Sequence, residues 1–364
     1  MLAECALGPV AEPFPDIAHI AVLRGGGLGD LLFAMPAVHA LARAYPGARI
    51  TLMGTEMHRE LLDRPSPVRE VLPLPRVHGV HDPRGEGTDH EAARQYLRRV
   101  GQVDLAVQLH GGGRWSNPFI NALRPRHSAG GRTPDAEPLE RNLPFRYFQH
   151  EVMRWLEVAG LAGAPPVQLV PQLAITPGDL AAARRVIGEP ELPVVVIHPG
   201  ASDPRRRWPA GRFARVAAEC AARACVLVVG DASEAALADD VVRLATAGGQ
   251  ADRIRSLAGR LSMSALVGVL ARADVVLAND SGPRHLAEAV GTPTVSVYWM
   301  GNVINAGSPG RLRNRVHISW TSRCPVCGVD CTRPDVDRCP HDVSFVADVE
   351  VRDVLPDVLE FATG

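Results

Sequence analysis

Asp30 is the first residue whose type and position could do chemistry. It closes the segment R-G-G-G-L-G-D, residues 24–30, which follows a short apolar run and opens a stretch with helical periodicity. Gly26 and Gly27 would let a ligand approach the backbone closely, and a carboxylate at this point could act as a general base. The dinucleotide fingerprint G-x-G-x-x-G fails in every register, so a dinucleotide site is not indicated. The alternative is an acid of the first helical turn that complements the helix dipole.

Three consecutive arginines, Arg205–Arg207, follow a second apolar run at residues 194–197. His198 and Ser202 lie in the same stretch, which continues into W-P and a helical pattern. A triplet of this kind is often a solvated charge run. An arginine fork placed after a strand is also suited to bidentate contact with phosphate, and we favour this interpretation.

A third apolar run ends in N-D-S-G-P, residues 279–283, and a helical pattern follows. Asp280, Ser281, Gly282 and His285 stand at this junction, where free backbone amides could cradle an anion. Glu234 stands at a similar strand end and could accept a hydrogen bond from a ribose hydroxyl or an adenine amine. For both segments a simple capping turn is the alternative.

The composition excludes several classes of function. All 39 basic residues are arginine, so a Walker A loop, a pyridoxal imine and a protein kinase site each lack the lysine they need. Basic and acidic residues number 39 and 40, which leaves no positive field for nucleic acid. No apolar run has the length of a transmembrane segment, and the N-terminus does not resemble a signal peptide. We therefore expect a cytoplasmic protein without nucleic-acid partners.

The elements that must position these residues alternate between short apolar runs and helical periods, which predicts an α/β fold with parallel sheets. We expect eight strands, near residues 17–23, 49–53, 68–72, 105–109, 194–198, 226–230, 275–278 and 294–298. We expect helices near residues 31–45, 145–159, 210–223, 234–247, 264–272, 283–290 and 349–361.

The domain boundary is expected near residue 170, because residues 160–178 are rich in proline and glycine and have no clear period. This predicts an N-terminal Rossmann-like domain at residues 1–170 and a second one at 171–345. Residues 346–364 would form a terminal helix that packs back on the first domain or on its own domain. A ligand would lie in the cleft between the two doubly wound domains.

The motifs occur in a characteristic order: R-x-x-x-L-G-D, H-P-G-A-S with an arginine cluster and W-P, G-x-x-x-E, and N-D-S-G-P-x-H-L-A-x-A-x-G-T-P. This set resembles glycosyltransferase family 9, the ADP-heptose lipopolysaccharide heptosyltransferases, from residue 17 to about residue 300. The resemblance implies a GT-B fold, a nucleotide-activated heptose or related sugar as donor, and inverting transfer that needs no metal ion. It implies no cofactor beyond the nucleotide sugar, which is a co-substrate.

The resemblance also implies roles for individual residues. Asp30 matches the catalytic aspartate that takes the proton of the acceptor hydroxyl. The donor would be bound by seven residues: Ser202, Arg206, Glu234, Asp280, Ser281, Gly282 and His285. Arg206 stands where the family usually has a lysine on the donor phosphates.

The acceptor side departs from the common family pattern. Gly26 and Gly27 stand where many members have serine or threonine, and a second glycine-rich segment, H-G-G-G-R-W-S-N, begins at His110 and Gly111. These four residues are candidates for an acceptor or phosphate loop. The departure suggests a glycan, glycolipid or natural-product acceptor other than ordinary lipopolysaccharide core.

Four cysteines near the end of the chain have the only metal-like spacing, C-x2-C-x3-C-x7-C. They are Cys324, Cys327, Cys331 and Cys339. This spacing is compatible with a structural zinc site or a local disulfide, and neither would be catalytic.

Two other functions stay open at this point. A nucleotide-sugar epimerase of the same architecture would eliminate the diphosphate without transferring the sugar to an acceptor. A catalytically degenerate member would bind a sugar without turning it over.

Overall fold

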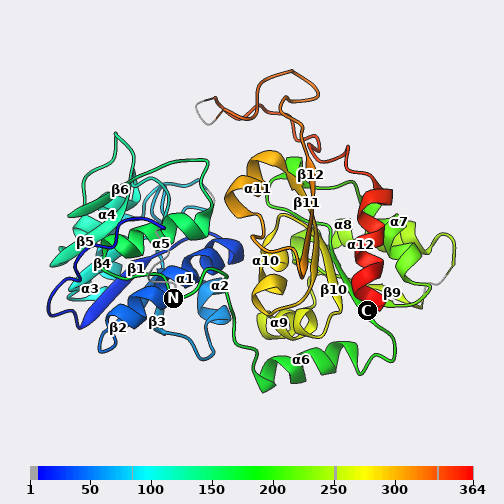
Figure 1. Cartoon of the computed structure of the whole chain (residues 1–364), viewed down its shortest axis with the longest axis horizontal. Helices are drawn as coiled ribbons and strands as arrows, with labels where there is room; N and C mark the ends of the chain where they lie inside the picture. Colours follow the sequence, from blue (N-terminus) through cyan, green and yellow to red (C-terminus); the bar gives the residue numbers. More distant parts are fainter. Residues whose placement is uncertain (1–6, 84, 250–251, 334–335, 364) are drawn as a thin grey trace. The chain divides into compact units, whose positions relative to one another are not determined.

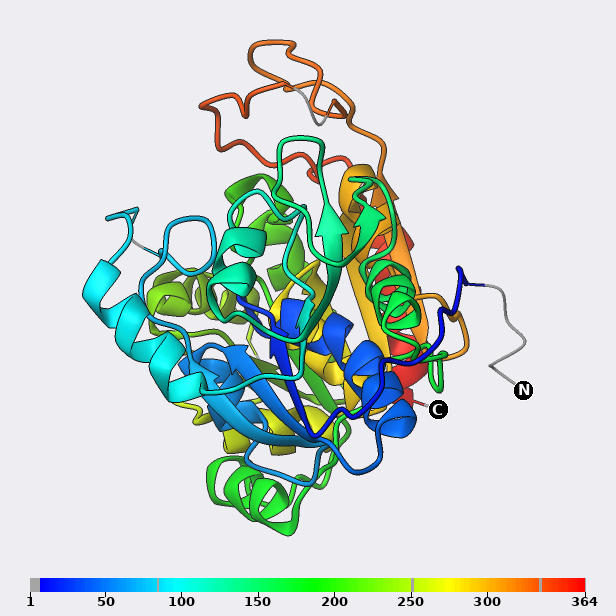
Figure 2. The same ribbon diagram turned by 90° about the vertical axis from the view of Figure 1, so that its left-hand side faces the viewer.

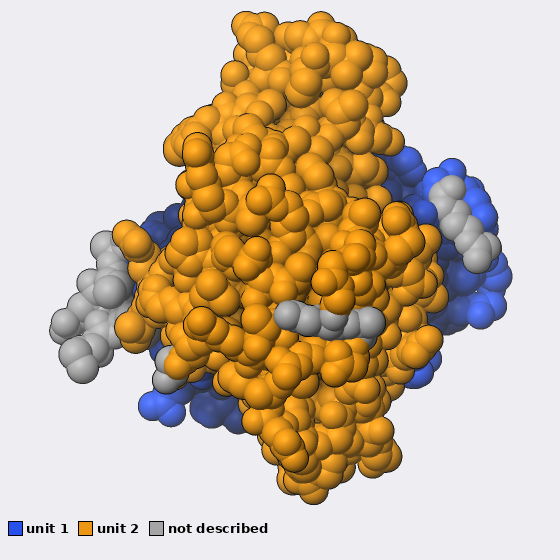
Figure 3. Space-filling view, turned by 90° about the vertical axis from the view of Figure 1, so that its right-hand side faces the viewer, with its two compact units in different colours: residues 1–174 blue, residues 175–364 orange. Residues whose placement is uncertain are grey.

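The chain folds into two compact units, Met1–Ala174 and Ile175–Gly364, which are coloured separately in Figure 3. The computed structural model describes residues 7–83, 85–249, 252–333 and 336–363. Each unit is built on one six-stranded parallel sheet with helices packed against it (Figure 1). The α/β class predicted from the alternating apolar runs and helical periods is confirmed.

The sheet of the first unit has the strand order β3-β2-β1-β4-β5-β6. Its strands are β1 (His19–Leu23), β2 (Arg49–Gly54), β3 (Val68–Pro73), β4 (Leu105–Gln108), β5 (His127–Arg132) and β6 (Arg141–Pro144). Its helices are α1 (Leu28–Ala44), α2 (Glu56–Leu61), α3 (His90–Val100), α4 (Ser116–Ala122) and α5 (Glu151–Leu161). Helices α3 and α4 share a core with one face of the sheet, and α1 packs on α5 across from α3 (Figure 2).

The sheet of the second unit has the strand order β12-β11-β10-β7-β8-β9. Its strands are β7 (Val194–His198), β8 (Cys225–Val228), β9 (Ile254–Ser256), β10 (Val275–Asn279), β11 (Thr294–Trp299) and β12 (Asn314–Ser319). Its helices are α6 (Pro177–Ile187), α7 (Ala210–Cys220), α8 (Ala235–Thr246), α9 (Met263–Ala271), α10 (Gly282–Ala289), α11 (Met300–Ala306) and α12 (Val351–Thr363). Two short 3-10 turns are η2 (Pro204–Arg206) and η3 (Ala232–Glu234).

Helix α12 packs on the unit to which it belongs in sequence, one of the two placements considered for it above. Val351, Val354, Val358 and Ala362 are buried in one core with residues of α7 and α8 and of the central strands. Their spacing of three and four residues aligns them on one face of the helix.

Both sheets have the same strand order, and both therefore have the same switch point. In the first sheet β2 and β3 lie on one side of β1, and β4 lies on its other side, so the switch point is between β1 and β4. In the second sheet the switch point is between β7 and β10 for the same reason. Loops that leave the carboxyl ends of such neighbouring strands diverge to opposite faces and leave room for a ligand. The loops after β1 and β4, and those after β7 and β10, carry most of the residues singled out from the sequence.

All eight predicted strands are present, and four further strands were missed. The missed strands are β5, β6, β9 and β12. β6 and β9 have only four and three residues, β5 contains two glycines, and β12 is interrupted by Arg315 and His317. The helix predicted at residues 145–159 begins at Glu151, because the chain first forms β6 and a turn. Helix α6 begins at Pro177, inside the stretch predicted as a linker, with Thr176 as its cap. Within the described ranges no helix combines the length and the apolar character that crossing a bilayer requires.

Candidate active site

Asp30 is the third residue of α1, at the carboxyl end of β1. Its Oδ2 accepts a hydrogen bond of 2.8 Å from the backbone N–H of Gly27, and its Oδ1 accepts one of 2.6 Å from Arg24. Nevertheless 49% of its side-chain surface is exposed. The two interpretations offered for Asp30 therefore do not compete, because it caps the helix and also presents a carboxylate to solvent.

Arg24 orients this carboxylate from the buried side. Its side chain is almost fully buried and donates to the backbone oxygens of Asp30 and Leu109, at 2.8 and 2.7 Å, and to Glu151 Oε2 at 3.3 Å. The sequence reasoning gave no role to Arg24 or Glu151. The position of Arg24 directly after a buried strand was a usable signal, whereas Glu151 lies 127 residues away in sequence and offered none.

Gly26 allows the turn to wrap around the carboxylate. Its φ is +89°, and a Cβ at this position would lie 2.4 Å from Asp30 Oδ2. Gly27 is the residue that caps α1, and its carbonyl oxygen lies 3.1 Å from His58 Nε2. Glycine at position 26 therefore serves the placement of Asp30 directly, whereas a Cβ at Gly27 would lie 3.8 Å from Asp30 Oδ2, at ordinary contact distance.

Two histidines, the buried His58 and the partly buried His110, support the same turn in their neutral form. His110 Nδ1 lies 3.2 Å from the backbone nitrogen of Gly25, whose N–H can donate to it. Burial lowers the pKa of His110 to about 4, and the charge of Arg24 contributes in the same direction. Burial also lowers the pKa of His58 to about 4, against the opposing effect of its bond to Gly27. Both rings are consequently uncharged at neutral pH.

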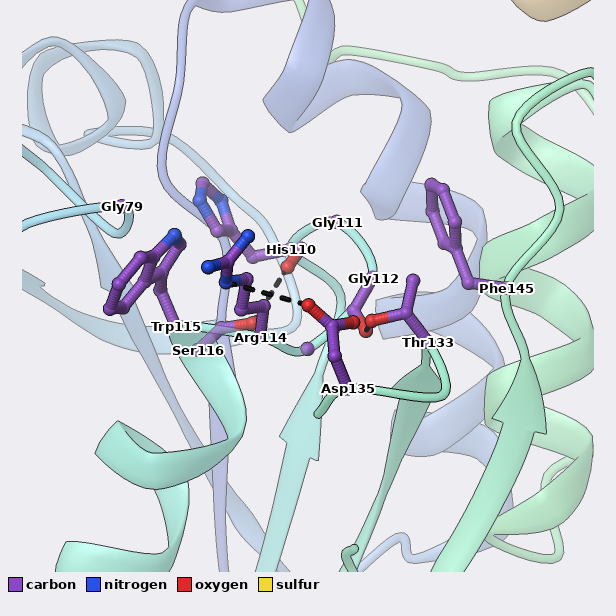
Figure 4. A pocket seen from close by; sticks show the side chains of 11 residues that line it. Gly79, His110, Gly111, Gly112, Arg114, Trp115, Ser116, Thr133, Asp135 and Phe145 are labelled. Carbon is purple, nitrogen blue, oxygen red and sulfur yellow. Dashed lines mark hydrogen bonds and ion pairs between the residues drawn. The ribbon is translucent and has the colours of Figure 1, made fainter. Parts of the chain in front are cut away.

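A pocket of about 280 Å³ opens beside this turn, at the carboxyl ends of β4 and β5 (Figure 4). Trp115 and Phe145 lie on opposite sides of it, and Arg114 pairs with Asp135 between them at 3.4 Å. His110 and the glycines 111–113 line it as well. Of the four candidates for an acceptor or phosphate loop, His110 and Gly111 are therefore among the residues that line this pocket, and Gly26 and Gly27 are not. Trp115 is 47% exposed, which leaves part of its ring free for a ligand.

The second unit brings together residues from the loops after β7 and β10. Arg206 donates to Asp280 Oδ2 at 2.8 Å and to Ser202 Oγ at 2.5 Å. Asn302, from α11, donates to the same oxygen of Asp280 at 2.8 Å. Arg206 is the only arginine of the predicted triplet that bonds to another predicted site residue among those described. Arg205 pairs with Asp203, and the Arg207 side chain donates to a backbone oxygen of its own loop.

His198 connects two more of the predicted residues. Its Nδ1 lies 2.9 Å from Ser281 Oγ, and its Nε2 lies 3.1 Å from Glu234 Oε2. Burial would raise the pKa of Glu234, but the bond and charge of His198 outweigh this effect and lower it. Gly200 makes room for the glutamate, since a Cβ there would lie 1.7 Å from Glu234 Oε1.

Asp280 is a buried carboxylate that stays ionised. Burial alone would raise its pKa, but the hydrogen bond and charge of His285 and the charge of Arg206 lower it to about 2. His285 Nε2 lies 2.9 Å from Asp280 Oδ1. Burial lowers the pKa of His285, against the opposing pull of Asp280. Gly282 opens α10 beside these side chains, and the first amides of that helix have no partner within it.

The cysteine prediction needs one correction. The ligand atoms of Cys324, Cys327, Cys339 and His341 all lie within 4.8 Å of one another, and we call these residues the Cys3His cluster. Cys331 is not part of it, because its Sγ turns back toward the oxygen of Val329, at 3.4 Å. Counting cysteine spacing alone overlooked the histidine two residues after Cys339.

Comparisons with known proteins identify the family. Residues 125–325 match the profile of glycosyltransferase family 9 (heptosyltransferase), which is more than half of the chain. Lipopolysaccharide heptosyltransferase 2 of Escherichia coli K12 is 26% identical over 303 residues, covering 77% of this chain and 82% of the relative.

Solved structures agree with the fold. The structure of E. coli ADP-heptose lps heptosyltransferase II matches with a TM-score of 0.73 at 19% identity, covering 95% of this chain and 98% of that chain. A more distant match, at a TM-score of 0.55 and 14% identity, is the dodecameric iron-containing heptosyltransferase TibC of E. coli, in complex with ADP-D-beta-D-heptose. It covers 96% of this chain and 78% of that chain. The chain therefore belongs to glycosyltransferase family 9 and is a glycosyltransferase of the GT-B fold.

Proposed function

We propose that this enzyme transfers a heptose-type sugar from ADP-heptose to a hydroxyl group of a lipopolysaccharide core-like or natural-product glycoside acceptor. The names of its relatives support ADP-heptose and lipopolysaccharide as the substrate classes. In this proposal the first unit binds the acceptor and carries the base, and the second unit binds the donor. The anomeric configuration is inverted, and no metal ion takes part in the transfer.

The observation that carries the proposal is the half-exposed carboxylate of Asp30, held in one orientation by Arg24 and Gly27. Each carboxylate oxygen already accepts one hydrogen bond and keeps a lone pair for a second. An acceptor hydroxyl can therefore give its proton to Asp30 while its oxygen attacks the anomeric carbon. The bond from that carbon to the diphosphate breaks, and ADP leaves with the electron pair.

The leaving diphosphate gains negative charge during this step and needs positive partners. Arg206, whose side chain is 23% exposed, supplies a guanidinium, and the start of α10 supplies backbone N–H groups beside Ser281 and Gly282. Asp280 holds Arg206 from the buried side, and His285 orients Asp280. Glu234 is proposed to contact the nucleoside, and Ser202 a phosphate.

The pocket lined by His110, which contacts Gly25 of the Asp30 turn, is the proposed acceptor site. Trp115 and Phe145 offer aromatic faces for the apolar side of a sugar ring, while Arg114, Asp135 and His110 offer polar contacts. Glycines 111–113 leave the backbone accessible between them.

The test is an assay of the purified chain with ADP-heptose, UDP-glucose and GDP-mannose, each with and without a heptose-deficient lipopolysaccharide acceptor. We expect ADP release only with ADP-heptose and acceptor together, a heptosylated acceptor by mass spectrometry, and an inverted anomeric centre by NMR. Omitting Mg²⁺ and Mn²⁺ from the assay buffer should leave the initial rate unchanged. An altered donor sugar formed without any acceptor would contradict the proposal and favour the epimerase.

A further inference from the structure

The segment at residues 320–346 carries the Cys3His cluster, none of whose members is proposed to bind the donor. It connects β12 to α12 and extends beyond the sheet of its unit (Figure 1, Figure 2). All four ligand atoms lie within 4.8 Å of one another. Tetrahedral Zn²⁺ with Zn–S bonds of about 2.3 Å places its sulfurs about 3.8 Å apart, so small side-chain adjustments would close the site.

The first two cysteines lie on a tight turn of C-P-V-C-G sequence. The N–H of Gly328 donates to the oxygen of Cys324 at 2.9 Å, and Gly328 has a φ of +73°. This turn places the sulfurs of Cys324 and Cys327 within 4.8 Å of each other.

The other two ligands come from a later part of the same segment. Cys339 is buried, and His341 Nδ1 lies 3.8 Å from Cys324 Sγ. Three thiolates and one imidazole form a combination found in structural zinc sites. Thiolate-rich tetrahedral sites favour zinc or iron over the hard cations that prefer oxygen ligands.

The segment has only a small hydrophobic core of its own. Its own buried core consists of Cys324, Cys339 and Phe345, and its described residues form one isolated β-bridge, between Arg323 and Asp330. So small a core does not offset the conformational entropy of ordering the chain without a covalent or metal staple.

We propose that the Cys3His cluster binds one Zn²⁺ in tetrahedral coordination. We also propose that this metal fixes residues 320–346 against Arg205–Arg207, which we call the arginine loop. The second half of this inference rests on the proposed function. The metal has no part in the transfer step and acts only through the position of the loop.

The contacts of the segment with the arginine loop are direct. The N–H of Phe345 donates to the oxygen of Arg205 at 2.7 Å, and Ser344 Oγ donates to the oxygen of Arg207 at 2.6 Å. The guanidinium of Arg205 lies 5.4 Å from the centre of the Phe345 ring. Arg206 stands between these two anchored residues, so loss of the metal would loosen the residue proposed to hold the diphosphate.

The metal is tested by elemental analysis of the full chain, purified without chelator from cells supplied with both zinc and iron. We expect roughly one zinc per chain in the wild type. Cys327→Ser and His341→Ala should lose most of it, whereas the matched control Cys331→Ser should keep it. Wild-type protein without metal, or with these thiols joined in a disulfide, would overturn the site. Stoichiometric iron would overturn the assignment to zinc, and metal loss in Cys331→Ser would overturn the ligand set.

The effect of the metal on the arginine loop is tested by calorimetry. The binding of ADP to the wild-type chain is measured before zinc removal, after zinc removal, and again after zinc is restored. We expect ADP to bind about 5-fold or more weakly without zinc and to recover with it. An unchanged affinity for ADP would overturn the proposed effect of the metal on the arginine loop, but not the metal site itself. Absence of ADP binding in every form would count against the proposed function and not against the zinc site, which the elemental analysis decides independently.

Discussion

Single residues near Asp30 combine structural and chemical roles. Asp30 caps α1 and presents its carboxylate, while Arg24, almost fully buried, contacts Asp30, Glu151 and the backbone after β4. The position of the Asp30 carboxylate therefore depends on the protonation states of the side chains around it. The two histidines of this turn make that dependence measurable.

His110 should make the stability of the protein depend on pH. Its pKa of about 4 in the folded chain lies below the value of 6.5 for an exposed histidine. Between these values the unfolded chain binds more protons, so stability is full above about pH 6.5 and falls as the pH drops toward 4. Lowering the pH from about 7 to about 5 should cost about 2 kcal/mol through this residue.

The measurement is urea unfolding at both pH values for the wild type, for His110→Gln and for the exposed control His90→Gln. Glutamine can still accept the bond from Gly25, so the variant should fold. We expect the loss on acidification to be smaller by about 2 kcal/mol in His110→Gln and unchanged in the control. Identical losses in all three proteins would show that His110 is not a buried neutral group.

Trp115 should matter for the acceptor and not for the donor. Its partly exposed ring lines the proposed acceptor pocket. Trp115→Ala should raise the acceptor KM by about 3- to 10-fold, as expected for losing one aromatic contact, with the ADP affinity unchanged. Trp320→Ala is the control, because this tryptophan is exposed outside the pocket. Equal acceptor KM values for both variants would remove Trp115 from the site.

The elements explain which parts of the site could be predicted. Strands such as β7 and β10 are continuous apolar runs, and polar residues that follow them directly stand out in the sequence. For this reason Asp280 and Ser202 could be grouped with Arg206, to which hydrogen bonds join both of them. Strand β5, with the sequence HSAGGR, carries no such run, so its position beside β4 could not be predicted.

Partners that are distant in sequence were the main omission. Asn302 reaches Asp280 from α11, and Glu151 reaches Arg24 from α5. Neither contact has a local pattern, because it depends on how helices pack on the sheet. His341 was missed for a different reason, since a metal site was sought in cysteines alone.

The loop after β7 offers a test at the scale of one element. Gly200→Ala would place a Cβ 1.7 Å from Glu234 Oε1 and push the glutamate away from His198. Because Glu234 is proposed to contact the nucleoside, its displacement should remove about one hydrogen bond to ADP, so the Kd for ADP should rise about 5-fold. The control Gly211→Ala adds a methyl group where nothing lies within 4 Å, in α7. ADP binding by Gly200→Ala as tight as by the control would exclude this role of the loop.

At the scale of the whole molecule, the two units have separate proposed tasks, catalysis with acceptor binding in one and donor binding in the other. The proposed base and acceptor pocket belong to residues 1–174, and every proposed donor contact belongs to residues 175–364. Each unit has its own sheet and core, so a change in the base should not disturb the donor residues. Chemistry and donor binding should therefore be separable by mutation.

The most direct measurement compares kcat and ADP affinity in Asp30→Asn. Asparagine can still accept the bond from Gly27 but cannot take a proton from the acceptor. We expect kcat to fall by about 100-fold or more, the usual contribution of a general base, while the Kd for ADP stays within about 2-fold. Asp89→Asn, which changes a capping carboxylate at the start of α3, should leave both unchanged. Turnover near the wild-type rate in Asp30→Asn would contradict the account.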